Sequence, residues 1–224
     1  FRFALLRLRD RSFELNELHL QMDTPGLWDV HCHTEFSYCG TTVRARRNIE
    51  LSRELGLAGL CLTEHAFQLY FENETAWSFR WQTDPILVRR TWSRGRHRMQ
   101  DYRQFVAPLR DRFVRLGLEV DLRSNSRLLL APEDAQGWDI LVGSVHQIPA
   151  LDMSRTAQED AERLFLRETA RLLKQPIQVL AHPFRFFRRA QRARPQHLYG
   201  EVASMLARSG VAAEINYHTN SPDP

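Results

Sequence analysis

The sequence has few cysteines and no long apolar segment, and both shortages exclude classes of protein. Cys32, Cys39 and Cys61 form neither an even set nor a C-x-x-C pair, which argues against a disulfide framework and favours a reducing compartment. No apolar stretch approaches the roughly 20 residues that span a bilayer, and arginines interrupt the hydrophobic N-terminus too often for a secretory signal. We therefore expect a cytoplasmic protein that is neither inserted into a membrane nor exported.

Lysine is also scarce, and the basic residues are overwhelmingly arginine. The net charge of +4 and the pI near 9.3 give a mild positive field that suits an anionic substrate. The arginines form two clusters, at Arg89, Arg90, Arg94, Arg96 and Arg98 and at Arg185, Arg188, Arg189, Arg192 and Arg194. The first cluster lies in a segment without clear periodicity, where a solvated loop competes evenly with a nucleic-acid contact. The second follows directly on His182, and this position favours a functional role.

Strand-like and helix-like segments alternate along the chain. Apolar runs predict strands at residues 27–33, 58–63, 118–122, 140–145, 177–181 and 211–216. Helical spacing predicts helices at residues 43–55, 102–116, 156–174 and 198–208, with an irregular stretch up to about residue 97. The expected helix signals are a cap at Thr41 or Thr42, a capping box at Thr156–Glu159, a break at Pro108, and stops at Gly56 and Gly210.

The alternation implies βαβ units and a parallel sheet, and six or more such units favour closure into a (β/α) barrel. In such a barrel the active site lies at the C-terminal ends of the strands. Residues 1–26 do not follow the pattern, so we expect an N-terminal extension there, with a hairpin as the simplest form. Residues 27–224 are expected to form one barrel domain, for which the length of 224 residues is sufficient.

Five consecutive predicted strands end in an imidazole or a carboxylate. The candidate metal ligands at these ends are His31, His33, His65, Glu119, His146 and His182. Residues two apart in a strand point the same way, so His31 and His33 can both reach one metal while Cys32 faces the core. Imidazole nitrogen and carboxylate oxygen suit Zn²⁺, Mn²⁺ or Fe²⁺. Six ligands are too many for one tetrahedral ion, so the sequence predicts two divalent ions, or three.

A lone histidine at a strand end is more often a satisfied core group than a metal ligand. Six titratable groups at equivalent strand ends favour the ligand interpretation, because burying them together without an ion would be costly. Asp121 shares a face with Glu119 and is a weaker carboxylate candidate. Glu64 points away from His65, and we expect it to be an orienting or structural acid.

The motif order resembles that of the polymerase and histidinol phosphatase (PHP) family of metal-dependent phosphoesterases. The motifs are D-x-H-x-H-T from Asp29, then T-E-H, G-x-E-x-D, G-S-V-H, A-H-P-F and E-I-N, so the resemblance runs from Asp29 to the C-terminus. Each motif is short, but their order is highly specific. The resemblance implies a distorted (β/α)7 TIM-like barrel with a trinuclear metal site, and the size and motif order are closer to the stand-alone phosphatases.

The resemblance also implies a division of the ligands among the metals. His31, His33 and Glu119 would hold the first metal. Glu119 would bridge to a second metal bound by His146 and His182, and His65 would help to hold a third. Cys39 stands where the family commonly has a histidine or an acid, and a zinc-ligating thiolate and a buried structural thiol are equally good interpretations. The family's D-x-H motif on a seventh strand has no match before Pro224, so we expect the chain to be C-terminally incomplete.

The expected reaction is hydrolysis of a small phosphate monoester by a metal-bound hydroxide. Arg185 and Arg188, just after His182, are the candidates for bidentate phosphate binding, with a solvated basic loop as the alternative. Asn216 would contact the substrate, and His218 would contact it or protonate the leaving group. A histidinol-phosphate-like compound is the first expected substrate.

Two other functions fit the same residues. A metal-dependent nuclease would use Trp77, Trp81 and Trp92, with their neighbouring arginines, as a face for single-stranded nucleic acid. A degenerate barrel would bind metal only for structure. The sequence is silent on the oligomeric state and on the identity of the metal.

Overall fold

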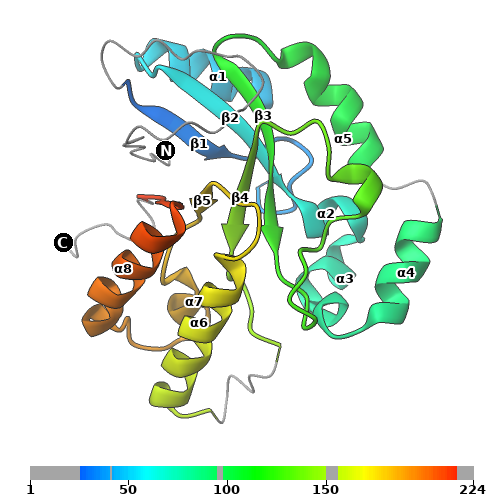
Figure 1. The fold of residues 1–224 in the computed structure, drawn as a ribbon. Helices are drawn as coiled ribbons and strands as arrows, with labels where there is room; N and C mark the ends of the chain where they lie inside the picture. Colours follow the sequence, from blue (N-terminus) through cyan, green and yellow to red (C-terminus); the bar gives the residue numbers. More distant parts are fainter. Residues whose placement is uncertain (1–25, 41, 95–97, 150–155, 216–224) are drawn as a thin grey trace.

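Among the residues that the structure describes, six parallel strands form one sheet in which strands consecutive in the chain are neighbours, in the order β1-β2-β3-β4-β5-β6. The computed structural model describes residues 26–40, 42–94, 98–149 and 156–215. The strands are β1 (Trp28–Cys32), β2 (Gly59–His65), β3 (Val114–Asp121), β4 (Ile140–Ser144), β5 (Val179–Leu180) and β6 (Ala212–Ala213). The sheet curls into a half-barrel (Figure 1), which confirms the α/β class and the parallel, barrel-like arrangement.

Helices surround the curled sheet. In chain order they are α1 (Ala45–Glu54), α2 (Ala66–Tyr70), α3 (Asn73–Ser78), η1 (Arg80–Gln82), α4 (Pro85–Ser93), α5 (Arg98–Val106), η2 (Ala107–Leu109), η3 (Pro132–Asp134), α6 (Gln158–Leu172), α7 (Arg185–Arg189), η4 (Gln196–Leu198) and α8 (Tyr199–Ser209). Helices α1 and α5 flank β1 to β3, and helices α6, α7 and α8 lie around β4 to β6 (Figure 1). Of the helices in the described part of the chain, none combines the length and the apolar character needed to span a bilayer.

The stretch between β2 and α5, expected to be irregular, is mostly helical. It contains α2, α3, η1 and α4, so that prediction was wrong. The start of α4 is encoded locally, because the Asp84 side chain accepts hydrogen bonds from the backbone N–H groups of Ile86 and Leu87 and Pro85 occupies the first turn. Trp81 is fully buried in this segment and its Nε1 donates to the carbonyl oxygen of Ala76. Tertiary burial, rather than amphipathic spacing, therefore holds the segment in place.

Two predicted helix starts were also wrong. The backbone N–H of Ala45 at the start of α1 donates to the Glu35 carboxylate at 2.8 Å, so Thr42 is not the cap, and Thr41 lies outside the described residues. The capping residue of α6 is Ala157, whose side chain has no acceptor oxygen. The predicted stops are confirmed, since the glycines that follow α1 and α8 adopt the left-handed conformation that ends a helix.

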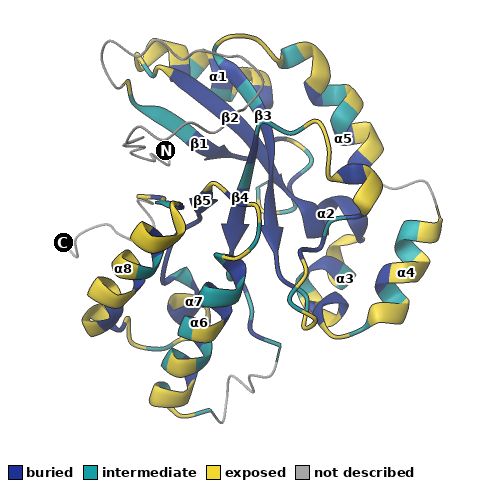
Figure 2. Ribbon diagram, in the orientation of Figure 1, coloured by how far each residue is buried: buried dark blue, intermediate teal, exposed yellow. Residues whose placement is uncertain are grey.

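The buried side chains form two clusters on the two faces of the sheet. The larger cluster lies between the sheet and the helices and includes Cys32, as expected. The smaller cluster lies on the concave face, and we call it the apolar floor: Val30, Cys61, Ile140, Val142, Val179 and Ala181. Figure 2 shows the strands almost wholly buried and the outer helix faces exposed. The concave face is thus closed at one end by apolar side chains, which leaves the C-terminal strand ends for polar groups.

Candidate metal centre

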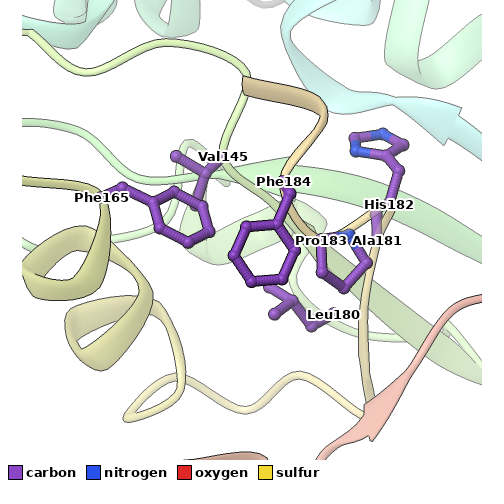
Figure 3. A pocket seen from close by; sticks show the side chains of 7 residues that line it. All are labelled: Val145, Phe165, Leu180, Ala181, His182, Pro183 and Phe184. Atoms are coloured by element: carbon purple, nitrogen blue, oxygen red, sulfur yellow. The ribbon is translucent and has the colours of Figure 1, made fainter. Parts of the chain in front are cut away.

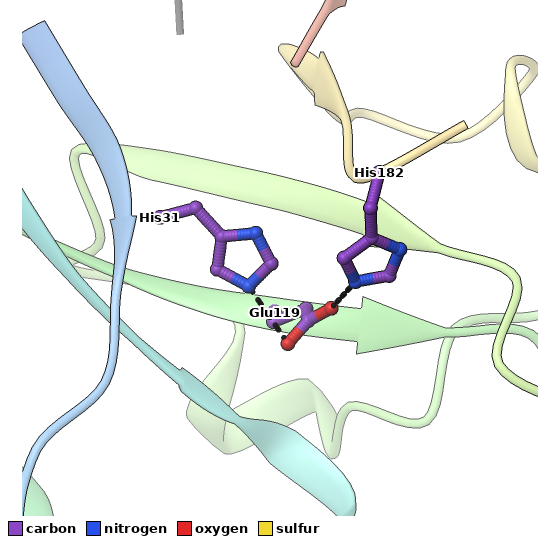
Figure 4. A group of neighbouring side chains, drawn as sticks. All are labelled: His31, Glu119 and His182. Atoms are coloured by element: carbon purple, nitrogen blue, oxygen red, sulfur yellow. Dashed lines mark hydrogen bonds and ion pairs between the residues drawn. The ribbon is translucent and has the colours of Figure 1, made fainter. Parts of the chain in front are cut away.

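Glu119, on the central strand β3, is the point at which the predicted ligands meet. Its side chain is completely buried. Its Oε2 atom lies 2.9 Å from His31 Nε2, 3.6 Å from His33 Nε2 and 2.6 Å from His65 Nδ1, and its Oε1 atom lies 3.3 Å from His146 Nε2 and 2.9 Å from His182 Nε2. Figure 4 shows two of these rings, from β1 and from the turn after β5, converging on the carboxylate. We refer to the six residues as the histidine cluster.

Two departures from regular strand geometry turn His31 and His182 towards Glu119. Their chain neighbours Val30 and Ala181 lie in the apolar floor, so strict alternation would point both histidines to the opposite face. In β1 the pairing register shifts between residues 29 and 32, which lets successive side chains share the concave face. After β5, His182 has φ +27°, an uncommon conformation for a residue other than glycine. Such outliers are found where the surrounding structure enforces a functional geometry.

The turn after β5 is held by apolar packing. Figure 3 shows His182 at the rim of a small pocket lined mainly by apolar side chains. Phe184, also in the left-handed region with φ +72°, contacts the Phe165 ring of α6 at a centroid distance of 5.3 Å. Pro183 between them restricts the backbone further. The strained His182 backbone is therefore supported by a packed aromatic contact.

Second carboxylates bind the outward-facing nitrogens of three rings. His31 Nδ1 lies 3.1 Å from Glu214 Oε2, His146 Nδ1 lies 2.9 Å from Asp121 Oδ1, and His33 Nδ1 lies 3.3 Å from Glu64 Oε1. A carboxylate at Nδ1 favours a proton on that nitrogen, so Nε2 is the nitrogen that faces Glu119 and is placed to bind a cation. Glu64 therefore lies where an orienting acid would, and Asp121 contacts the outer side of a ring rather than the centre.

Glu214 was not among the predicted site residues. Its signal was the E-I-N motif, which marks a carboxylate near the end of the sixth predicted strand. Without the position of β6 next to β5, nothing in the sequence indicated which histidine this carboxylate would meet. The tertiary structure places it against His31 and the backbone of His182.

The donor set fits divalent cations. In the described part of the chain, two groups of three have ligand atoms within 4.8 Å of one another: His31, Glu119 and His182, and His33, His65 and Glu119. Among the described residues, His31 Nε2, His65 Nδ1 and Glu119 Oε2 are buried and lack a hydrogen bond of acceptable geometry, although the nitrogens lie within 2.9 Å of the oxygen. Buried lone pairs directed at one point without hydrogen bonds are the surroundings that a metal ion satisfies. These five residues are among the six that the resemblance implies, and the two groups combine the histidines differently from the predicted division.

The protonation states also suit metal binding. Burial opposes ionisation of Glu119, but the fields of His31, His65 and His146 outweigh it and lower the pKa of Glu119 well below its usual value. Burial lowers the pKa of His65 and of His146 to about 3, and that of His182 to about 4. At neutral pH these three imidazoles are uncharged and their nitrogens can accept a cation without losing a proton first.

His31 and Asp121 shift the other way. Burial lowers the pKa of His31, but the Glu119 and Glu214 carboxylates outweigh it and raise the pKa to about 9. Burial, followed by repulsion from Glu119, raises the pKa of Asp121 to about 7. The cation on His31 thus offsets the negative charge of two buried carboxylates in the metal-free centre.

Cys39 lies behind His65 as seen from Glu119. Its sulfur is 3.2 Å from His65 Nε2 and 3.4 Å from Gln68 Nε2, while the other nitrogen of His65 faces Glu119. Cys39 as a residue is exposed, so it is not the buried structural thiol that was one expectation. Desolvation of its sulfur raises the pKa of the thiol, which keeps it protonated at neutral pH. Cys39 therefore belongs to neither group of three, and it either supports His65 by hydrogen bonding or serves a further ion on that side.

An arginine that was not singled out for substrate binding approaches the histidine cluster. The Arg189 guanidinium lies 5.2 Å from the Trp77 ring centroid and 5.0 Å from that of Phe79. These rings in turn contact His65 at 6.0 Å and His146 at 6.4 Å. The guanidinium is thus held by two aromatic faces beside the histidine cluster.

The predicted substrate-binding residues have different positions. Burial is the main cause of the lowered pKa of His146, and repulsion from Arg189 and Arg185 lowers that pKa further. Both arginines therefore direct positive charge towards the centre. Arg188 is exposed on α7. Asn216 and His218 lie outside the described residues, as do residues 1–25 of the expected N-terminal extension.

A parallel half-barrel with imidazoles and carboxylates gathered at the C-terminal strand ends defines an α/β protein whose clustered side chains could hold metal ions. The family model of the PHP domain matches residues 29–218, and the chain belongs to the PHP family. Comparison with curated proteins gave no match. The family is one of metal-dependent phosphoesterases, which agrees with the cluster of potential ligands.

Proposed function

We propose that the protein is a metal-dependent phosphoesterase that hydrolyses a small phosphate monoester. The observation that carries the proposal is the convergence of five imidazoles on one buried, ionised carboxylate at the C-terminal end of a PHP half-barrel. Burying that many titratable groups together is costly unless cations complete the site. The half-barrel would be completed as the distorted (β/α)7 barrel of the family, and a cytoplasmic location remains our prediction.

The histidine cluster would hold two divalent ions, Zn²⁺, Mn²⁺ or Fe²⁺, with Glu119 shared between them. His31 and His182 would serve one ion and His33 and His65 the other, while His146, whose Nε2 lies 3.3 Å from Glu119 Oε1, belongs to neither group of three. A third ion would draw on Cys39. When bound, such ions supply Lewis-acid polarisation of the phosphate and activation of a water nucleophile.

The surrounding residues provide recognition of the phosphate. Arg185 and Arg189 direct positive charge at the centre, and a guanidinium can bind two phosphate oxygens at once. Trp77 and Phe79 restrict the Arg189 side chain, which lowers the entropy cost of binding. Arg188 and Asn216 are proposed as further substrate contacts, and His218 as the acid that protonates the leaving group.

We infer a small monoester, of the histidinol-phosphate type, in preference to a nucleic acid. The nuclease alternative requires Trp77, Trp81 and Trp92 as a stacking face. Trp81 is fully buried, and Trp92 packs against Tyr70 at 5.9 Å. Of the three rings, only that of Trp77 lies beside the histidine cluster.

The test is a phosphatase screen of protein reconstituted with Mn²⁺, Fe²⁺ or Zn²⁺. Histidinol phosphate, sugar phosphates, nucleotides and p-nitrophenyl phosphate would be compared by phosphate release. His33→Ala should lower kcat/KM at least about 100-fold, whereas His197→Ala, which changes an exposed histidine paired with Glu162, should have little effect. Metal-loaded protein that releases no phosphate from any of these compounds would contradict the proposal and favour a non-catalytic, metal-binding barrel. Salt-dependent binding and cleavage of single-stranded DNA would instead favour the nuclease.

A further inference from the structure

We propose that Glu214 is a positioning residue that holds two metal ligands from different strands in place with one oxygen atom. The inference rests on the proposed function only in requiring that the histidine cluster binds metal. Glu214 directly follows β6, which is only two residues long, and the proposal gives this short strand a specific role in building the centre.

A single atom makes both contacts. Glu214 Oε2 lies 3.1 Å from His31 Nδ1 and accepts a hydrogen bond from the backbone N–H of His182 at 2.5 Å. The side chain is 0% exposed, so the carboxylate has no competing bulk water. The backbone N–H of Glu214 donates to the carbonyl oxygen of Leu180 at 3.0 Å, which anchors the residue to β5. One carboxylate therefore ties the first strand of the half-barrel to the turn after the fifth.

Both contacts constrain ligand geometry. The contact at Nδ1 holds a proton on that nitrogen, so Nε2 is the nitrogen that can exchange its proton for a cation. The contact at the backbone holds His182 in the positive-φ conformation that directs its ring at Glu119, against the preference of a residue with a Cβ atom. His31, Glu119 and His182 are one of the two groups of three, so Glu214 supports two of the three members of that group.

The other orienting acids support other members of the histidine cluster. Asp121 contacts only His146 of the cluster, through the ring and the backbone N–H. Glu64 contacts the His33 ring, Thr34 and the backbone N–H of His65, so it supports the other group of three. Removing Glu214 should therefore weaken the ion held by His31 and His182 more than the ion held by His33 and His65.

The experiment compares Glu214→Ala and Glu214→Gln with the wild-type chain and with Glu201→Gln, a matched change of an exposed glutamate on α8. Co²⁺ and Zn²⁺ would be titrated against a chromophoric chelator, the Co²⁺ absorption spectrum recorded, and folding checked by circular dichroism in metal-free buffer. Glu214→Ala should weaken one ion about 10- to 100-fold, with a changed Co²⁺ spectrum, and leave the other within about threefold. Glu214→Gln keeps an acceptor oxygen and should lose less metal affinity than Glu214→Ala. This graded loss would not be expected if Glu214 only stabilised the fold.

Wild-type affinity for both ions and an unchanged Co²⁺ spectrum in folded Glu214→Ala would overturn the proposal. If that variant does not fold, Glu214→Asp replaces it, because the shorter side chain cannot span both contacts. Wild-type affinity for both ions and an unchanged spectrum in folded Glu214→Asp would overturn the proposal in the same way. Equal weakening of both ions would also count against it. Phosphate release measured on the same samples separates the two ideas, since wild-type protein that binds both ions without hydrolysing an ester contradicts the phosphoesterase and not the role of Glu214.

Discussion

The concave face of the sheet has two ends with opposite chemistry, although the same strands build both. On β4, Ile140 and Val142 lie in the apolar floor and His146 follows just beyond the strand. On β2, Cys61 belongs to the floor and His65 to the histidine cluster. The two ends are separated by only a few residues along each strand.

The difference shows how the fold tolerates a centre that costs free energy. The floor removes apolar side chains from water, at roughly 25 cal/mol per Å² buried, and needs no partners beyond close packing. The histidine cluster buries carboxylates and imidazoles, which is unfavourable unless each is compensated by charge, hydrogen bonds or a metal. We therefore expect changes in the floor to alter stability and changes in the cluster to alter metal binding.

The largest expected effect is that of Glu119→Gln. Both groups of three share this carboxylate, so its loss should weaken both ions by more than the 10- to 100-fold that is typical of outer contacts. Metal content after gel filtration, measured by elemental analysis, tests this, with Glu201→Gln as the control. Retention of both ions at wild-type stoichiometry would mean that Glu119 is not the shared ligand of the two ions.

Gly117→Ala should affect both ends, because Gly117 lies on β3 two residues before Glu119. An added Cβ would lie 2.4 Å from the Ile140 carbonyl oxygen and 2.9 Å from Thr63 Cγ2, so a strand must move. We expect a loss of about 1–3 kcal/mol in the free energy of unfolding together with weaker metal binding. Urea denaturation and chelator competition on the same samples measure the two effects, and a change in neither would show that the two ends are not mechanically linked.

Val142→Ala tests the floor alone. Val142 is fully buried, so removing two methyl groups should lower the free energy of unfolding by about 2 kcal/mol through lost burial and a residual cavity. Metal affinity should stay within about threefold of the wild type. A large loss of metal affinity in a folded variant would break the proposed division between the two ends.

The smallest effect is expected at Asp111, which precedes β3 at the end opposite to the histidine cluster. Burial opposes ionisation of Asp111, but hydrogen bonds from the backbone N–H groups of Val114 and Phe113, with help from the Arg53 guanidinium, outweigh it and lower its pKa below 3.8. Asp111→Ala should cost about 0.5–1 kcal/mol, because the site is largely exposed and screened by solvent.

The pH dependence at Asp111 follows from the direction of that shift. A lowered pKa in the folded state means that the stabilisation is complete above the unfolded-state pKa of 3.8 and is lost as the pH falls below it towards the folded-state pKa. Denaturation of the wild type and of Asp111→Ala between pH 6 and pH 3 should therefore give curves that converge at the acid end. Curves that stay parallel throughout would contradict the assignment.

Strand order and the residues at the strand ends were predictable because each strand carries its own apolar run and its own terminal imidazole or carboxylate. The helical segment after β2 was missed, although Asp84 and Pro85 form a recognisable helix start, because the buried Trp81 interrupts any simple amphipathic spacing. The cap at Ala45 was missed for another reason. Its acceptor, Glu35, is ten residues away, and only the loop conformation brings the two together.

The sequence alone determined the α/β class, the family and the set of side chains that gather at one end of the sheet, because these follow from local patterns and motif order. The tertiary structure decided how those side chains face one another. The register shift in β1 and the positive φ of His182 override strand alternation, and β6 brings Glu214 between them. Such features depend on contacts between residues far apart in the chain, which no local sequence pattern specifies.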